Sequence, residues 1–185
     1  MTSSASRWDE RYRGAPAPAL PSDLLVSFST LLPPRGRALD VACGAGRNAV
    51  YLAEHALEVV AVDRSQEALR QGRELARGRH GRVHWVQADL EMFELPAQAF
   101  DVISCFYYRD PALFPRLRSA LRSHGLLFYE TFTLDQLEFS GGPRNPAHLL
   151  RHGELLQVFG DWQVLYYFET WRERGAASLV ARKPA

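Results

Sequence analysis

Apolar and polar residues alternate in blocks along the first two thirds of the chain. Five short apolar blocks, rich in β-branched and aromatic residues, predict strands at 38–41, 58–62, 83–87, 101–106 and 126–131. Three stretches between them predict helices, at 47–54, 65–77 and 111–123. Ser65 suits the N-cap of the second helix, and Gly125 suits the stop of the third. This alternation indicates a parallel sheet with helices on both faces.

The last third of the chain breaks the alternation. Apolar stretches at 161–170 and 177–181 flank the polar turn 172–175, which predicts an antiparallel hairpin. We therefore predict one α/β domain over residues 1–185, with a seven-stranded, mostly parallel sheet and a C-terminal antiparallel hairpin. Outside this frame lie an N-terminal segment with a stiff connector at 15–21, a glycine- and proline-rich loop at 139–146, and a short helix near 154–159.

A glycine turn follows the first predicted strand. Gly44 and Gly46 allow the backbone to approach a ligand closely, and the helix that starts near Arg47 offers unpaired N–H groups to it. Asp63 ends the next strand, about 17 residues after Gly46. An acid there commonly binds a ribose diol, although it can also cap the helix that begins at Ser65. The pair predicts a nucleotide-like cofactor.

Two classes of cofactor use such a pair. Gly44, Gly46 and Ala49 also satisfy the loose dinucleotide fingerprint, so an NAD(P)-dependent oxidoreductase is one alternative. Asp40, four residues before the first glycine, would repel a pyrophosphate but suits the amino-acid end of S-adenosylmethionine (SAM). Asp89, at the end of the third strand, can accept a hydrogen bond from an adenine amine. These two acids favour SAM.

The stretch 40–46 (DVACGAG), Asp63 and Asp89-Leu90 resemble the three cofactor motifs of class I SAM-dependent methyltransferases, in order and at ordinary spacing. Ala42 stands where that family often has a further glycine. The resemblance implies a Rossmann-like methyltransferase fold. It also implies a cofactor site formed by Asp40, Ala42, Gly44, Gly46, Asp63, Arg64, Asp89, Leu90 and Cys105.

Short patches at both ends of the chain and in the glycine turn resemble the small tellurite-resistance and thiopurine type of methyltransferase. They are 8–12 (WDERY), 44–48 (GAGRN) and 178–183 (SLVARK). In such enzymes the N-terminal segment folds over the cofactor, so the resemblance implies that Trp8 and Tyr12 are lid residues. It also implies a small, soft nucleophile as the methyl acceptor.

The acceptor is expected beyond the fourth and fifth strands. Tyr107 follows the fourth, and Glu130 lies inside the fifth, where a buried acid needs a partner. Arg144 in the loop 139–146 is the nearest candidate, so we predict that Glu130, Tyr107 and Arg144 form the acceptor-side catalytic wall. No Asn/Asp-Pro-Pro-aromatic tetrapeptide follows the fourth strand, which argues against methylation of nucleobase amines.

Composition points to a small-molecule acceptor rather than nucleic acid or membrane, because 22 basic residues against 21 acidic ones leave a net charge of +1. No apolar run approaches 18 residues and no secretory signal is recognisable, so we expect a cytoplasmic location. The expected oligomeric state is a monomer or homodimer. Cys43 and Cys105 lack the spacing of a disulfide or metal site and read as small core residues, and we assign no metal. A SAM-binding regulatory protein without catalysis is a further alternative.

Overall fold

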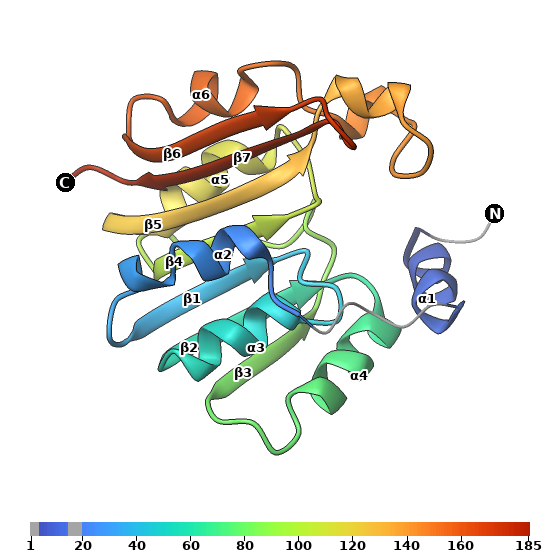
Figure 1. Ribbon diagram of the computed structural model, residues 1–185. Helices are drawn as coiled ribbons and strands as arrows, with labels where there is room; N and C mark the ends of the chain where they lie inside the picture. Colours follow the sequence, from blue (N-terminus) through green and yellow to red (C-terminus); the bar gives the residue numbers. More distant parts are fainter. Residues whose placement is uncertain (1–3, 15–19) are drawn as a thin grey trace.

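The structure is a computed structural model that describes residues 4–14 and 20–185. One seven-stranded sheet has the order β3-β2-β1-β4-β5-β7-β6 (Figure 1). Only β7 is antiparallel to its neighbours, which confirms the predicted α/β fold with its C-terminal hairpin. The strands are β1 (Gly36–Val41), β2 (Leu57–Asp63), β3 (Arg82–Gln87), β4 (Phe100–Phe106), β5 (Leu121–Phe132), β6 (Gln163–Thr170) and β7 (Ala176–Arg182).

Two apolar layers cover the two faces of the sheet. Phe128 and Tyr129, neighbours in β5, are both fully buried but belong to different layers, because successive strand residues point to opposite faces. The layer around Phe128 is covered by α2 (Asp23–Ser27) and α3 (Arg47–Glu54), with α4 (Gln66–Leu75) beside α3. The layer around Tyr129 is covered by α5 (Leu113–Ala120) and α6 (Glu154–Phe159).

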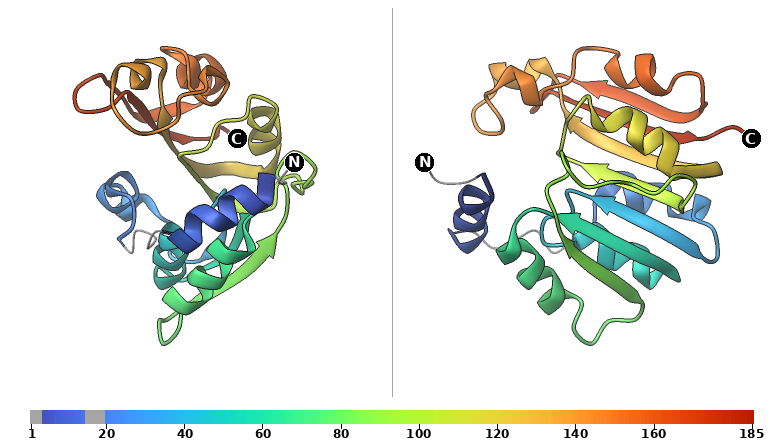
Figure 2. Two further views of the ribbon diagram at one scale, coloured as in Figure 1. Left: turned by 90° about the vertical axis from the view of Figure 1, so that its right-hand side faces the viewer. Right: turned by 180° about the vertical axis from the view of Figure 1, so that it is seen from behind.

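The carboxyl ends of β1, β2, β4 and β5 meet at one edge of the sheet. Asp40 in β1 pairs in register with Ala61 and Ser104, and Phe106 at the end of β4 pairs with Glu130. The N-terminal helix α1 (Ser4–Gly14) lies beyond this edge, next to α4 (Figure 2). Of the predicted connector 15–21, residues 15–19 lie outside the described residues.

Helix α5 differs from the expected helix. It ends at Ala120, and β5 begins at once with Leu121, which pairs with Phe100. Lys183 caps the carboxyl end of α5, because its Nζ donates to the carbonyl oxygens of Arg118 and Leu121 at 2.6 and 2.7 Å. Gly125 is therefore not a helix stop. It lies inside β5, where a Cβ atom would press against the side chain of Leu121.

Other helix boundaries follow the sequence more closely. Ser65 caps α4 as predicted, because its Oγ accepts a hydrogen bond from the amide of Ala68 at 3.1 Å. The helix ends at Leu75, two residues before the expected end. Short 3₁₀ turns lie before β1 and between β5 and α6, at Ser29–Leu31, Leu134–Glu138 and Pro146–His148. Across residues 4–14 and 20–185, every helix is too short or too polar to cross a membrane.

Candidate functional site

The glycine turn after β1 has a backbone that favours glycine. Gly44 and Gly46 have φ values of 56° and 72°, in the left-handed region. Ala42 shares this conformation with φ 52°, so the departure from the family pattern at this position places a side chain in a disfavoured backbone. The amide of Cys43 donates to the carbonyl of Val62 at 3.0 Å, which ties the turn to β2.

Trp85 in β3 supports this turn from behind. A Cβ atom on Gly46 would overlap the indole ring, and so would a Cβ atom on Gly72 in α4. Both positions therefore need glycine, because a side chain at either one would collide with the tryptophan. Gly46 also needs glycine because its φ is left-handed. The ring fills the space between the turn and α4. The sequence pattern did not reveal this role of Trp85, because neither glycine is near it in the chain.

Asp63 accepts hydrogen bonds from two backbone amides and so ties the residue that caps α4 to the glycine turn. Its Oδ1 accepts from the amide of Ser65 and its Oδ2 from the amide of Gly44, both at 2.8 Å. Burial raises the pKa of this carboxyl, and the hydrogen bonds from the two amides oppose that rise. Each oxygen keeps a lone pair that can accept from a ligand hydroxyl.

Asp40 is almost fully buried, with 1% of its surface exposed. Its Oδ1 accepts from the hydroxyl of Ser104 at 2.7 Å. In the described part of the chain, Oδ2 is buried and has no hydrogen-bond partner within 3.5 Å. Burial raises the pKa of Asp40 to about 7, against the opposing effects of the Ser104 hydroxyl and the Ala49 amide. Such a carboxylate would be stabilised by a cationic group.

The third motif lies beyond β3. Asp89 forms an ion pair with Arg64, and its Oδ1 accepts from the amide of Glu91 at 3.1 Å, so hydrogen bonds hold its pKa below the ordinary value. Leu90 is buried in the apolar layer around Tyr129. Arg64 and Asp89, unlike Leu90, therefore keep polar side chains partly exposed here.

Cys105 does not take the expected position at the cofactor. Its side chain is fully buried beside Tyr129, 3.7 Å from the carbonyl oxygen of Tyr108, and burial raises the pKa of the thiol to about 12. The reason is strand alternation: Cys105 belongs to the apolar layer around Tyr129, whereas its neighbour Phe106 belongs to the layer around Phe128. The side chain of Cys105 therefore lies in the core.

Helix α1 lies over the carboxyl edge. Asp9 accepts from the hydroxyl of Ser65 at 2.6 Å and from the amide of Glu67 at 3.1 Å, both at the start of α4. Gln71 donates to the carbonyl of Tyr12 at 2.7 Å. The Tyr12 hydroxyl lies where a Cβ of Gly44 would project, and burial raises the pKa of Tyr12. The half-buried Trp8 and Tyr12 thus belong to a helix placed next to the glycine turn.

On the other side of the edge, Glu130 joins three residues and is 6% exposed. Its Oε1 accepts from the Tyr107 hydroxyl at 2.8 Å and from Arg174 at 3.4 Å, and its Oε2 accepts from Ser178 at 2.7 Å. Arg174 also donates to the Tyr107 hydroxyl at 3.0 Å.

The expected pairing of Glu130 with Arg144 is therefore wrong. Arg144 donates to the carbonyls of Leu137 and Phe139 at 2.9 and 2.8 Å, within its own part of the chain. Because β7 is antiparallel to β5, the hairpin turn before β7 lies at the carboxyl end of β5, and it brings Arg174 to Glu130. The sequence predicted the hairpin and its polar turn, but not that β7 pairs with β5.

Tyr107 is held in an unusual conformation. Its φ of 59° is left-handed, which is uncommon for a bulky residue. Its amide donates to the carbonyl of Glu130 at 2.7 Å, and its hydroxyl is fixed by Glu130 and Arg174. Burial, with the nearby Glu130, raises the pKa of its phenol. Strain of this kind persists where surrounding contacts impose it, and it clusters at functional sites.

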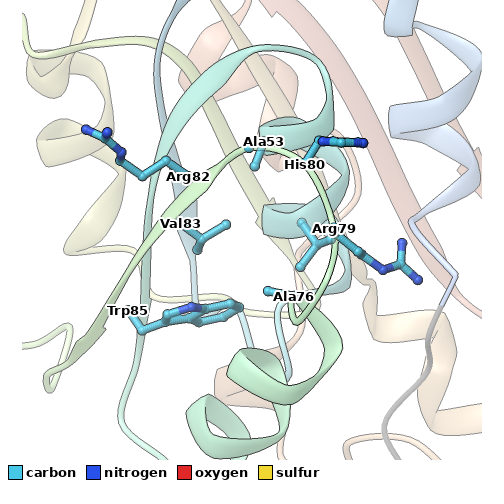
Figure 3. Close-up of a pocket in the computed structure, with 9 residues that line it drawn as sticks. Ala53, Ala76, Arg79, His80, Arg82, Val83 and Trp85 are labelled. Atoms are coloured by element: carbon cyan, nitrogen blue, oxygen red, sulfur yellow. The ribbon is translucent and has the colours of Figure 1, made fainter.

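A cavity of about 250 Å³ lies elsewhere, at the amino end of β3 (Figure 3). Trp85 forms one wall, and Ala53, Ala76 and Val83 form others, while the guanidinium groups of Arg79 and Arg82 point away from it. The acids, the glycine turn and Tyr107 are not among its lining residues. This cavity is separate from the candidate site.

Comparison with known proteins supports a methyltransferase. Residues 38–125 match the family model of the methyltransferase domain. The malonyl-[acyl-carrier protein] O-methyltransferase of Enterobacter lignolyticus is 32% identical over 108 residues. That alignment covers 55% of this chain and 41% of the relative, so the chain matches less than half of that protein's length.

Solved structures share the fold. TehB from Haemophilus influenzae superposes with a TM-score of 0.74 at 18% identity, over 96% of this chain and 67% of that one. A SAM-dependent methyltransferase from Mesorhizobium loti gives a TM-score of 0.69 at 17% identity, over 88% of this chain and 99% of that one. The chain thus has the fold of the class I SAM-dependent methyltransferases, and its residues 38–125 match the methyltransferase-domain family.

Proposed function

We propose that this protein is a SAM-dependent methyltransferase that methylates a small molecule. The observation that carries the proposal is Asp40, four residues before Gly44, whose buried Oδ2 forms no hydrogen bond within the described residues. A buried carboxylate favours a cationic ligand and opposes a pyrophosphate, which separates SAM from a nicotinamide dinucleotide. The family match of residues 38–125 supports the same choice.

The residues at the edge fit SAM. Asp40 would hold the ammonium group of its amino-acid end near the glycine turn, and Asp63 would accept from the ribose hydroxyls. Arg64 and Asp89 would hold the adenine end, with Trp8 and Tyr12 of α1 as a cover. When bound, SAM supplies an electrophilic methyl group on a positively charged sulfur. The protein must then align an acceptor with that methyl group and keep water away from it.

Glu130 and Tyr107 form the acceptor side in this proposal. Tyr107 donates its hydroxyl hydrogen to Glu130 and presents a partly exposed aromatic side chain, so in this proposal it orients the acceptor rather than removing a proton. Glu130 is the group that can receive a proton when the acceptor must lose one. Arg174 takes the position beside Glu130 that was expected for Arg144. A catalytic role for Arg144 itself stays a prediction.

The acceptor class is wider than the sequence resemblance suggested. The resemblance to the tellurite-resistance and thiopurine type implies small soft nucleophiles, and the fold shared with TehB is consistent with that type. The relative from E. lignolyticus is named for methyl transfer to an oxygen of a malonyl group, which adds carboxylates to the candidates. A cytoplasmic location and a monomeric or homodimeric state stay predictions.

Calorimetric titration tests the cofactor. SAM and its demethylated product, S-adenosylhomocysteine, should bind, whereas NAD and NADP should not, and Asp40→Asn should weaken SAM selectively. Tight binding of a dinucleotide without SAM would establish the oxidoreductase alternative. Turnover is then measured with thiols, phenols, amines, carboxylates and metalloid oxyanions. Good SAM affinity without turnover of any class would point to the regulatory alternative.

A further inference from the structure

Two arginines lie against the ring of Tyr107. The guanidinium carbon of Arg47, the first residue of α3, is 5.9 Å from the ring centroid, and that of Arg174, in the hairpin turn, is also 5.9 Å away. Tyr107 as a whole residue is 38% exposed. Residues from two distant parts of the chain therefore place positive charge around one accessible aromatic side chain at the acceptor edge.

These charges are only partly balanced. Glu130 is paired with Arg174 through a single oxygen at 3.4 Å, and it also accepts from Tyr107 and Ser178. The Arg174 side chain is 46% exposed. Asp23, at the start of α2, acts on Arg174 only as a weaker, more distant charge.

Arg47 contributes the second charge. Its Nη1 donates to the carbonyl of Leu20 at 3.1 Å, a neutral partner. Within residues 4–14 and 20–185, no carboxylate lies within ion-pair distance of Arg47. Arg47 and Arg174 therefore bring two positive charges to Tyr107. Among the described residues, the carboxylate in direct contact with this group is that of Glu130, which also accepts hydrogen bonds from Tyr107 and Ser178.

We infer that the methyl acceptor is a small organic anion, one that carries a carboxylate, bound beside Tyr107 by Arg47 and Arg174. The inference rests on the proposed function and narrows its acceptor class. A planar guanidinium presents parallel donors that match the two oxygens of a carboxylate, and Tyr107 offers an apolar surface for the body of the molecule. A neutral acceptor would form no ion pair with Arg47 or Arg174.

Binding of matched acids and amides tests the inference. The protein saturated with S-adenosylhomocysteine is titrated with acetate, malonate and benzoate, and with acetamide, malonamide and benzamide. At least one acid should bind about tenfold or more tightly than its amide, the usual strength of charge-assisted hydrogen bonds. Arg174→Gln and Arg47→Gln should each remove most of this preference while affinity for S-adenosylhomocysteine is kept, and Arg174→Lys should restore part of it.

Arg172→Gln is the matched control, because Arg172 is an exposed arginine in the same hairpin turn. It should leave the preference unchanged. Equal affinity for acids and amides, or no binding of any acid at millimolar concentration, would overturn the inference and leave the proposed function standing. Equal weakening of acids and amides by Arg174→Gln would show that Arg174 only holds Tyr107 in place, which also overturns it. Failure to bind S-adenosylhomocysteine would instead contradict the proposed function.

Discussion

Asp40 makes cofactor binding sensitive to pH. Burial raises its pKa to about 7, so the free protein takes up a proton there as the pH falls below that value. A cationic ligand favours the carboxylate, and this proton must leave when SAM binds. We predict that SAM affinity is constant above about pH 8 and falls by up to about tenfold per unit below pH 7. Calorimetric titrations between pH 5 and 8, about one for each half pH unit, measure the affinity for SAM.

Two variants separate Asp40 from other titrating groups. Asp40→Asn should bind SAM weakly with little change across this pH range. Ser104→Ala removes a hydrogen bond that favours the carboxylate, so it should move the fall in affinity to higher pH. A wild-type affinity that does not change between pH 5 and 8 would mean that SAM does not rely on the Asp40 carboxylate.

Ala42 offers a second test at the level of one residue. Its φ of 52° disfavours any side chain, and glycine should relieve this. We expect Ala42→Gly to raise the free energy of unfolding by about 1 kcal/mol, since left-handed backbone costs roughly 1–2 kcal/mol and the added freedom of the unfolded chain offsets about 0.4–1. Chemical denaturation measures the change.

Ala45→Gly, in the same turn, is the control. Ala45 is absent from the residues with positive φ, so glycine should only add freedom to the unfolded chain and lower stability by about 0.4–1 kcal/mol. The same change in both variants would mean that Ala42 carries no strain.

At the scale of elements, α1 is attached to the start of α4 through Asp9. We predict that Asp9→Ala releases α1 from the carboxyl edge and weakens SAM binding roughly tenfold, because a hydrogen bond to a charged group is worth about 1.5–3 kcal/mol. Trypsin should also cleave faster at Arg11 and Arg13. Glu10→Ala, at the exposed neighbouring position, should change neither measurement. Unchanged affinity and cleavage in Asp9→Ala would contradict a lid role for α1.

The hairpin shows how an element positions chemistry. Its existence followed from the apolar stretches on each side of a polar turn, and the structure confirms it. Its pairing with β5 places Ala176 opposite Phe132, and this pairing carries Arg174 to the acceptor edge. Arg174 and Glu130 are 44 residues apart in the chain. A contact at that separation depends on which strands pair, which local patterns do not contain.

At the scale of the whole molecule, one buried ion pair joins separate segments. Arg109, after β4, contacts Glu154 of α6 at 2.6 Å, and the two side chains are only 11% and 4% exposed. Arg109 also donates to the carbonyl of Ala147 at 2.7 Å. We predict that Glu154→Gln lowers the free energy of unfolding by about 3 kcal/mol or more, since it leaves a buried charge unpaired.

The pair of Arg118 and Asp161 is a natural comparison. It has a short bidentate geometry but lies at the surface, with side-chain exposures of 32% and 61%. Asp161→Asn should therefore cost less than about 1 kcal/mol in the same denaturation experiment. Similar losses in both variants would mean that burial does not decide the strength of these pairs.

The sequence by itself determined the features that depend on neighbours in the chain. Apolar periodicity predicted the strands, the helices and the hairpin, and glycines and acids at strand ends predicted the cofactor edge. The tertiary structure alone decided the features that depend on pairing between distant segments. It placed Arg174 rather than Arg144 beside Glu130, Trp85 behind Gly46, and Cys105 in the core. The physical reason is that periodicity records which side of an element is buried, whereas strand pairing and close packing decide what each buried or edge residue meets.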